Sequence, residues 1–256
     1  MEPDRIFGDV AELYDRRRPG YPAAAVEAVL DAAPGAAQAV VETGAGTGKA
    51  TAEFAARGAS VLAIEPDPRM AEICRANTAA TGRVEVLVAH LEDAVLEPGG
   101  FTIGLAAQSW HWVDPERGAA RMAEAIRSGG VLALMWNTAA EDRSPIRLAI
   151  EAAYRRHAPE LAETSVANRP VTVDGSGHES LVGPGRFDVP TWTAFPWTHR
   201  YTSREYVELL ATFSDHQLLA PDVRAALLAD VRAVIDDHGG SLDYRFVTDL
   251  GLLRRR

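Results

Sequence analysis

As far as Asn137, short apolar runs alternate with stretches whose apolar residues recur at helical spacing. The apolar runs predict strands at positions 40–43, 60–64, 84–88, 102–107 and 131–136. Asp67 and Pro68 provide a cap and a first position for the helix that follows the second strand, and a helix after Asp114 is expected to end at Gly129-Gly130. This alternation predicts an α/β fold with a parallel sheet covered on both faces.

Beyond Asn137 the pattern is looser and predicts a helical insertion followed by a return to the sheet. Apolar spacing predicts helices over 144–157 and 222–237, and Thr202 with Glu205 forms a capping box for another helix. The stretch 173–190 is rich in Gly, Pro and Ser and is expected to be a loop, whereas strands at 191–201 and 243–253 should pair antiparallel. We therefore divide one domain into three intervals, 1–140, 141–190 and 191–256.

A glycine-rich turn, Gly44-Ala45-Gly46-Thr47-Gly48, follows the first strand and opens directly into a helix. Glycines allow a tight turn and a close approach to a ligand, and free amides at a helix start face the bound group, so the turn predicts a nucleotide cradle. Thr43 and Ala50 occupy positions where a phosphate-binding Walker loop needs Gly and Ser or Thr, and Lys49 disfavours a dinucleotide fingerprint. Glu65 ends the next strand, where a carboxylate can accept both hydroxyls of a ribose.

Composition narrows the class of protein. The 256 residues carry a formal net charge of -10, which disfavours binding to nucleic acid or to an anionic membrane. No hydrophobic leader is evident, so a cytoplasmic location is expected. Cys74 stands alone, is expected in the core, and excludes an internal disulfide, while the scattered histidines predict no metal site. Ser214-Asp215-His216 is no hydrolase triad, because consecutive residues cannot adopt that geometry.

The sequence resembles a known enzyme family in several places. Glu-x-Gly-x-Gly-x-Gly, from Glu42 to Gly48, resembles the first motif of class I S-adenosylmethionine-dependent methyltransferases. Ala107 to Trp112, Arg127 to Gly130 and Trp136-Asn137 are similar to elements of the methyltransferase type 11 group, which includes trans-aconitate methyltransferase-like enzymes. The resemblance implies a doubly wound, Rossmann-like, seven-stranded and mostly parallel sheet with an antiparallel last strand, plus a helical lid and insertion.

The resemblance also implies roles for individual residues. The N-terminal segment with Tyr14, Arg18 and Tyr21 is expected to fold as a lid over the cofactor, although a solvated amphipathic helix is the alternative. Leu91 is expected to pack on the adenine, with Glu92 or Asp93 accepting from its amino group. The expected contacts of S-adenosyl-L-methionine are Tyr14, Arg18, Glu42, Gly44, Ala45, Gly46, Gly48, Glu65, Pro66, Leu91, Glu92 and Gln108.

The expected reaction is methyl transfer to a small molecule, on a carboxylate or hydroxyl oxygen. His111 is the candidate base, although packing between Trp110 and Trp112 explains it equally well, and Tyr21, Trp110 and Trp136 are candidates for the acceptor wall. The interval 141–190 is the expected acceptor cover. The alternatives are an NAD(P)-dependent oxidoreductase, or a protein that binds S-adenosylmethionine for another purpose. The protein is expected to be a monomer or homodimer.

Overall fold

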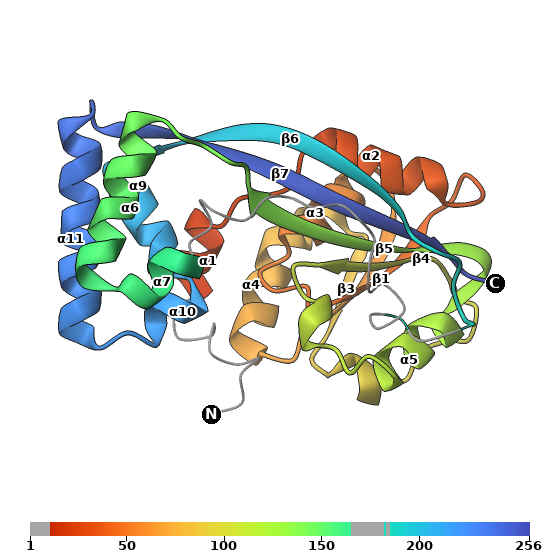
Figure 1. Ribbon diagram of the computed structural model, residues 1–256. Coiled ribbons are helices and arrows are strands. Elements are labelled where there is room, and N and C mark those ends of the chain that lie inside the picture. The colour runs from red at the N-terminus through yellow and green to blue at the C-terminus, as the bar shows by residue number, and fades with distance from the viewer. Residues whose placement is uncertain (1–10, 165–181, 183–184) are drawn as a thin grey trace.

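The computed structural model describes residues 11–164, 182 and 185–256, and the strands within these ranges form a seven-stranded sheet of order β3-β2-β1-β4-β5-β7-β6 (Figure 1). Neighbouring strands are parallel from β3 to β5, whereas β7 is antiparallel to both β5 and β6. The predicted sheet and its antiparallel last strand are therefore confirmed. The strands are β1 (Ala39–Thr43), β2 (Ser60–Ile64), β3 (Val84–Leu87), β4 (Phe101–Ala107), β5 (Ile126–Ala139), β6 (Thr191–Thr202) and β7 (Ser241–Arg254).

The sheet buries apolar side chains on both faces, as near-continuous apolar strands predict. Along β5, Leu132 and Leu134 pack in one core cluster, whereas Val131, Ala133 and Met135 pack in the cluster on the opposite face. The first cluster includes residues of α5 (Arg117–Ala125), and the second includes residues of α2 (Ala23–Ala32) and α3 (Lys49–Ala56). Helix α4 (Pro68–Thr78) packs on β3 and α3, and it buries Cys74 as predicted.

A third core lies at one end of the molecule, where helices pack on the extended ends of β6 and β7 (Figure 1). The helices of this cap are α6 (Pro145–His157), α7 (Pro159–Thr164), α9 (Ser203–Leu210), α10 (Ser214–Gln217) and α11 (Pro221–Asp237). The capping box of Thr202 and Glu205 is present at the start of α9, as predicted. Helices from the intervals 141–190 and 191–256 share this core, while most of the predicted loop at 173–190 lies outside the described residues.

One predicted helix boundary is wrong. Helix α5 ends at Ala125 rather than at Gly129-Gly130, because Ile126 already pairs with Phe101 as the first residue of β5. Between this pair and the pair Ile103–Val131, β5 advances five residues while β4 advances two, so the glycines lie in a bulge. Across the described residues, no helix is both long and apolar enough for a membrane span.

Candidate active site

The glycine-rich turn has the backbone that its sequence predicts. Gly44, Gly46 and Gly48 have φ angles of 62°, 59° and 85°, a region that side chains strongly disfavour. A Cβ on Gly44 would lie 2.5 Å from Cβ of Ser109, and one on Gly48 would lie 2.8 Å from Sγ of Cys74. Gly48 therefore allows α4 to pack closely against the turn, and it does not line either cavity of the site described below.

The carboxylate of Glu65 fixes this turn from the end of β2. Its Oε2 accepts a hydrogen bond from the backbone N of Gly46 at 2.7 Å, and its Oε1 accepts one from the backbone N of Asp67 at 2.9 Å. A carboxylate oxygen has two lone pairs, so one that accepts a backbone hydrogen bond can also accept from a ligand. Glu65 is buried yet lines a cavity, as a residue that accepts from a ribose must.

Two neighbouring cavities lie above the carboxyl ends of the parallel strands. The first has a volume of about 300 Å³ and extends from the glycine-rich turn to the helical cap. The second, of about 100 Å³, extends from the same turn to the segment after β3. Their linings share Tyr14, Gly44, Gly46, Ala107 and Gln108, so they are adjacent parts of one crevice. Ligands of open α/β sheets bind at this edge.

Glu42, at the end of β1, lines the first cavity but is almost completely buried. Its Oε2 accepts a hydrogen bond from the hydroxyl of Thr51 at 2.6 Å. Burial raises the pKa of Glu42 to about 8, because the Thr51 bond offsets only part of the desolvation and the carboxylate of Glu65 adds repulsion. Glu42 is therefore mostly protonated at neutral pH.

The N-terminal helix α1 (Ala11–Arg17) connects the sheet to the helical cap. Asp15 accepts a hydrogen bond from Asn77 on α4 at 2.9 Å and pairs with Lys49 at 3.4 Å. Arg17 pairs with Glu205 at 3.0 Å and with Glu208 at 2.5 Å, both on α9. The helix is thus docked on three helices, α3, α4 and α9, as the predicted lid requires.

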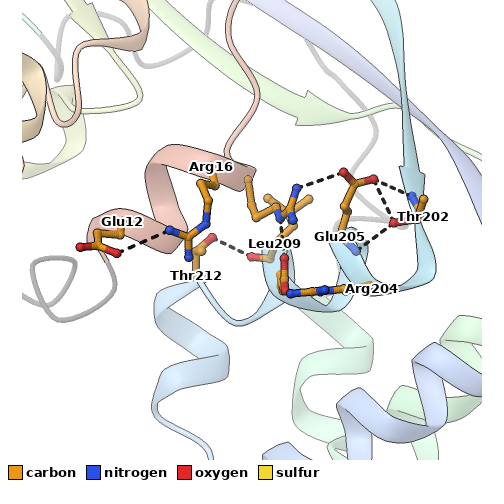
Figure 2. Close-up of polar contacts among 9 residues, drawn as sticks. Glu12, Arg16, Thr202, Arg204, Glu205, Leu209 and Thr212 are labelled. Atoms are coloured by element: carbon orange, nitrogen blue, oxygen red, sulfur yellow. Dashed lines mark hydrogen bonds and ion pairs between the residues drawn. The ribbon is translucent and has the colours of Figure 1, made fainter. Parts of the chain in front are cut away.

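Figure 2 shows the polar contacts at this junction. Along α1, Arg16 pairs with Glu12 at 3.5 Å, and both side chains are largely exposed. In the neighbouring cap, Glu205 closes the capping box with Thr202, and the hydroxyl of Thr212 donates to the carbonyl of Leu209 at 2.6 Å. The docking surface of α9 is therefore itself held by local hydrogen bonds.

Arg18 brings a positive charge into the first cavity. Its Nε donates to Oγ1 of Thr212 at 2.9 Å, and its Nη2 donates to the carbonyl of the same residue at 3.0 Å. Its guanidinium lies over the rings of Phe213 and Tyr14, with its carbon 4.3 Å and 5.0 Å from their centroids. Over the described part of the chain, Arg18 has no ion pair, so its charge is available to an anionic ligand.

Gln108 lies where the two cavities meet. It is the single non-glycine residue with a positive φ, 60°, among the residues described. Its backbone N donates to the carbonyl of Met135 at 2.8 Å, and its Nε2 donates to the carbonyl of Asn137 at 2.9 Å. These two hydrogen bonds hold Gln108 in a left-handed backbone conformation that is energetically unfavourable for a residue with a side chain.

The structure brings most of the predicted site residues together. The predicted residues that line the first cavity are Tyr14, Arg18, Tyr21, Glu42, Gly44, Ala45, Gly46 and Gln108. Those that line the second and not the first are Glu65, Pro66, Leu91 and Glu92. The adjacent Asp93 pairs instead with Arg117 at 3.2 Å.

Four predicted residues line neither cavity: Gly48, described above, and Trp110, Trp136 and His111. Trp110 is buried in the core beneath α5, and Trp136 packs against the same core, with its ring centroid 6.0 Å from that of Trp192. His111 is exposed beside Trp112, at 4.9 Å between ring centroids, and is not among the residues that line either cavity. The acceptor-wall and base roles of these residues stay predictions without support from the geometry.

The helical cap supplies residues that sequence reasoning missed. Leu209, Phe213, Ser214 and Asp215 of the α9–α10 segment line the first cavity, together with Tyr244 and Phe246 of β7. The segment Ser214-Asp215-His216 stands out in the sequence, but its chemistry is interpretable only once the cap is folded over the crevice. These features define a Rossmann-like α/β protein with a cradle for a ligand that carries a ribose.

Comparisons with known proteins extend this conclusion. Residues 41–134 match a family described as a methyltransferase domain. An uncharacterized methyltransferase of Mycobacterium tuberculosis is 32% identical over 233 residues, which cover 91% of this chain and 86% of that protein. An uncharacterized methyltransferase-like protein of Schizosaccharomyces pombe is 27% identical over 210 residues, covering 80% and 76% of the two chains. A methyltransferase structure from Anaeromyxobacter dehalogenans aligns with a TM-score of 0.64 at 21% identity, covering 93% and 97%.

The chain therefore belongs to the class I S-adenosylmethionine-dependent methyltransferases. The predicted family, enzyme class and cofactor are confirmed, and the oxidoreductase alternative is set aside.

Proposed function

We propose that this enzyme transfers the methyl group of S-adenosylmethionine to an oxygen atom, of a carboxylate or a hydroxyl, on a small molecule. The observation that carries the proposal is the crevice itself. Its second part is bounded by Glu65 and the glycine-rich turn, and its first part runs from that turn to an apolar cap. A nucleoside-bearing donor and a separate acceptor thus have adjoining places. The net charge of -10 supports a small acceptor over a nucleic acid.

The residues of the second cavity fit the nucleoside end of the cofactor. Glu65 offers acceptors for the ribose hydroxyls, and Leu91, which is buried, offers an apolar surface for the adenine. Oε1 of Glu92 accepts a hydrogen bond from the backbone N of Asp114 at 2.8 Å. Its Oε2 can then accept from the amino group of the adenine.

The residues near the turn fit the amino-acid end. The buried hydroxyl of Thr47 has no hydrogen-bond partner among the described residues, and Thr47 lines the first cavity. An unpaired polar group beside a cavity is compatible with a hydrogen bond to a bound ligand. Arg18 supplies charge for a carboxylate, while Glu42 and Gln108 lie close enough to the turn to contact an ammonium group.

When bound, S-adenosylmethionine would supply an activated methyl group, to which a nucleophile can bond in line as the C–S bond breaks and S-adenosylhomocysteine leaves. The task of the chain is then to exclude water and align the acceptor. Leu209, Phe213 and Phe246 provide apolar walls for this purpose. Tyr21 lines the same cavity, and burial raises its pKa well above the ordinary value, so its hydroxyl stays protonated and can donate to an acceptor oxygen.

Calorimetry with S-adenosylhomocysteine and with NAD tests the cofactor site. We expect S-adenosylhomocysteine to bind and NAD not to bind, and Glu65→Gln to weaken binding about tenfold or more, since a hydrogen bond to a charged group is worth about 1.5–3 kcal/mol. Glu72→Gln, an exposed change on α4, is the matched control. Equal affinity in both variants would contradict the assignment. Labelled cofactor with a panel of acids and phenols then tests methyl transfer.

A further inference from the structure

Asp215, at the start of the short helix α10, presents a free carboxylate oxygen at the cap end of the first cavity. Its Oδ1 accepts from the backbone N and from Nδ1 of His216, both at 2.7 Å. Its Oδ2 makes no hydrogen bond to any residue in the described ranges, and 51% of the side chain is exposed. One oxygen is therefore held in place while the other is available to a ligand in the cavity.

His216 holds this carboxylate from the buried side. Its ring is buried, and its Nε2 lies 2.6 Å from the hydroxyl of Tyr154 on α6. The rings of Tyr154 and Phe213 pack edge-on against it, each with a centroid distance of 5.6 Å. With Nδ1 bonded to Asp215 and Nε2 bonded to Tyr154, both ring nitrogens of His216 have a partner. His216 is a positioning residue for Asp215.

Asp215 forms no ion pair with the arginine that lines the same cavity. Arg18 lines the same cavity, but its guanidinium donates to Thr212 and forms no ion pair with any described carboxylate. Partial burial alone would raise the pKa of Asp215, but the hydrogen bonds and the charge of His216, assisted by the charge of Arg18, hold it below the ordinary value. Asp215 is thus an ionised acceptor of hydrogen bonds at neutral pH.

The cavity that Asp215 lines combines aromatic rings with polar side chains. Tyr14, Phe213, Tyr244 and Phe246 contribute aromatic rings to the first cavity. An aromatic wall favours a planar apolar ligand, and a free carboxylate oxygen beside it favours a ligand with a hydrogen-bond donor. A second carboxylate at that point would meet like charge at close range.

We propose that Oδ2 of Asp215 binds the O–H group of the methyl acceptor and selects a planar hydroxyl compound over a carboxylate. This inference rests on the proposed function, because it takes the first cavity as the acceptor end of the crevice. It separates the two kinds of oxygen acceptor that the sequence leaves open. It also replaces the exposed His111 with a group that faces the cavity.

Binding to the protein saturated with S-adenosylhomocysteine tests the proposal without requiring turnover. The probes are 4-ethylphenol and 4-ethylbenzoate, which share size and ring but differ in the polar group. Asp215→Asn keeps an acceptor for His216 and removes the charge, while Asp237→Asn removes a charge from an exposed site at the end of α11. Affinities are measured by ligand-observed nuclear magnetic resonance.

We expect the wild-type protein to bind the phenol at least tenfold more tightly than the benzoate. Asp215→Asn should bring this ratio close to one, and Asp237→Asn should leave it unchanged. His216→Asn should lower the ratio partway, whereas a merely structural role would weaken both probes equally. Three outcomes would overturn the role of Asp215 but not the proposed function: a ratio unchanged by Asp215→Asn, a wild-type preference for the benzoate, or binding of neither probe. Failure of the wild-type protein to bind S-adenosylhomocysteine would overturn the proposed function and this inference together.

Discussion

Replacing Glu42 with glutamine should remove a large pH dependence from the stability of the protein. Glu42 is almost completely buried, and its pKa is about 8 in the folded protein against an ordinary value of 4.5. Glutamine has the same shape and can still accept the hydrogen bond that Thr51 donates, but it cannot ionise. The substitution therefore isolates the cost of the charge.

The sign and size follow from linkage between protonation and folding. A carboxyl whose folded pKa is raised stabilises the fold fully below the unfolded pKa and loses that contribution as pH rises through the folded value. The window here extends from about pH 4.5 to about pH 8. One pH unit within it corresponds to about 1.4 kcal/mol, so the wild-type protein should lose about 3 kcal/mol relative to Glu42→Gln between pH 5 and pH 8.

Urea unfolding of both proteins at pH 5, 6, 7 and 8 measures this difference. Subtracting one curve from the other removes the titration of every group that the two proteins share. Glu72→Gln, at an exposed position on α4, should give a nearly constant difference. If the gap between the wild-type protein and Glu42→Gln changes by less than about 1 kcal/mol over this range, Glu42 titrates normally and the argument from burial is wrong.

Three further predictions concern packing and docking. Gly58→Ala should lower the free energy of unfolding by about 1 kcal/mol, because of its φ of 94° alone. Gly48→Ala should lower it by about 2–3 kcal/mol more, because its Cβ would also overlap the buried thiol of Cys74. Equal losses of the two variants in urea unfolding would contradict this. Arg17→Ala should cost about 1 kcal/mol and weaken binding of S-adenosylhomocysteine, while Arg16→Ala, which breaks a largely exposed pair, should do neither; calorimetry of both variants checks this. Tyr154→Phe should cost about 1–3 kcal/mol by leaving a buried imidazole nitrogen unpaired, and an unchanged midpoint of thermal unfolding would count against it.

Much of the fold was predictable because its signals are local. Apolar runs, capping residues and glycines specify elements over a few positions, and these signals located the strands, the turn at Gly44 to Gly48 and the capping box at Thr202. The end of α5 was missed because Gly129-Gly130 is as compatible with a bulge as with a helix stop. Pairing of Ile126 with Phe101, a long-range contact, decided between them.

The nucleoside end of the site was predictable for the same reason. The glycine-rich turn and Glu65 lie about twenty residues apart on consecutive strands, so parallel pairing brings them together. The acceptor end was not predictable, because Asp215 and Tyr244 reach the crevice only through packing of the cap. Trp110 and Trp136 were assigned to the acceptor wall from their residue type, but aromatic residues also fill cores, and both lie outside the cavity linings.

The left-handed backbone of Gln108 places the stability of the fold and the binding of the ligand in conflict at one position. Glycine there would relieve a conformation that costs other residues about 1 kcal/mol, yet it would delete the side-chain amide that donates to the carbonyl of Asn137. A search for more thermostable variants of this enzyme should therefore leave Gln108 unchanged, because a higher melting temperature at this position is expected to come with weaker ligand binding.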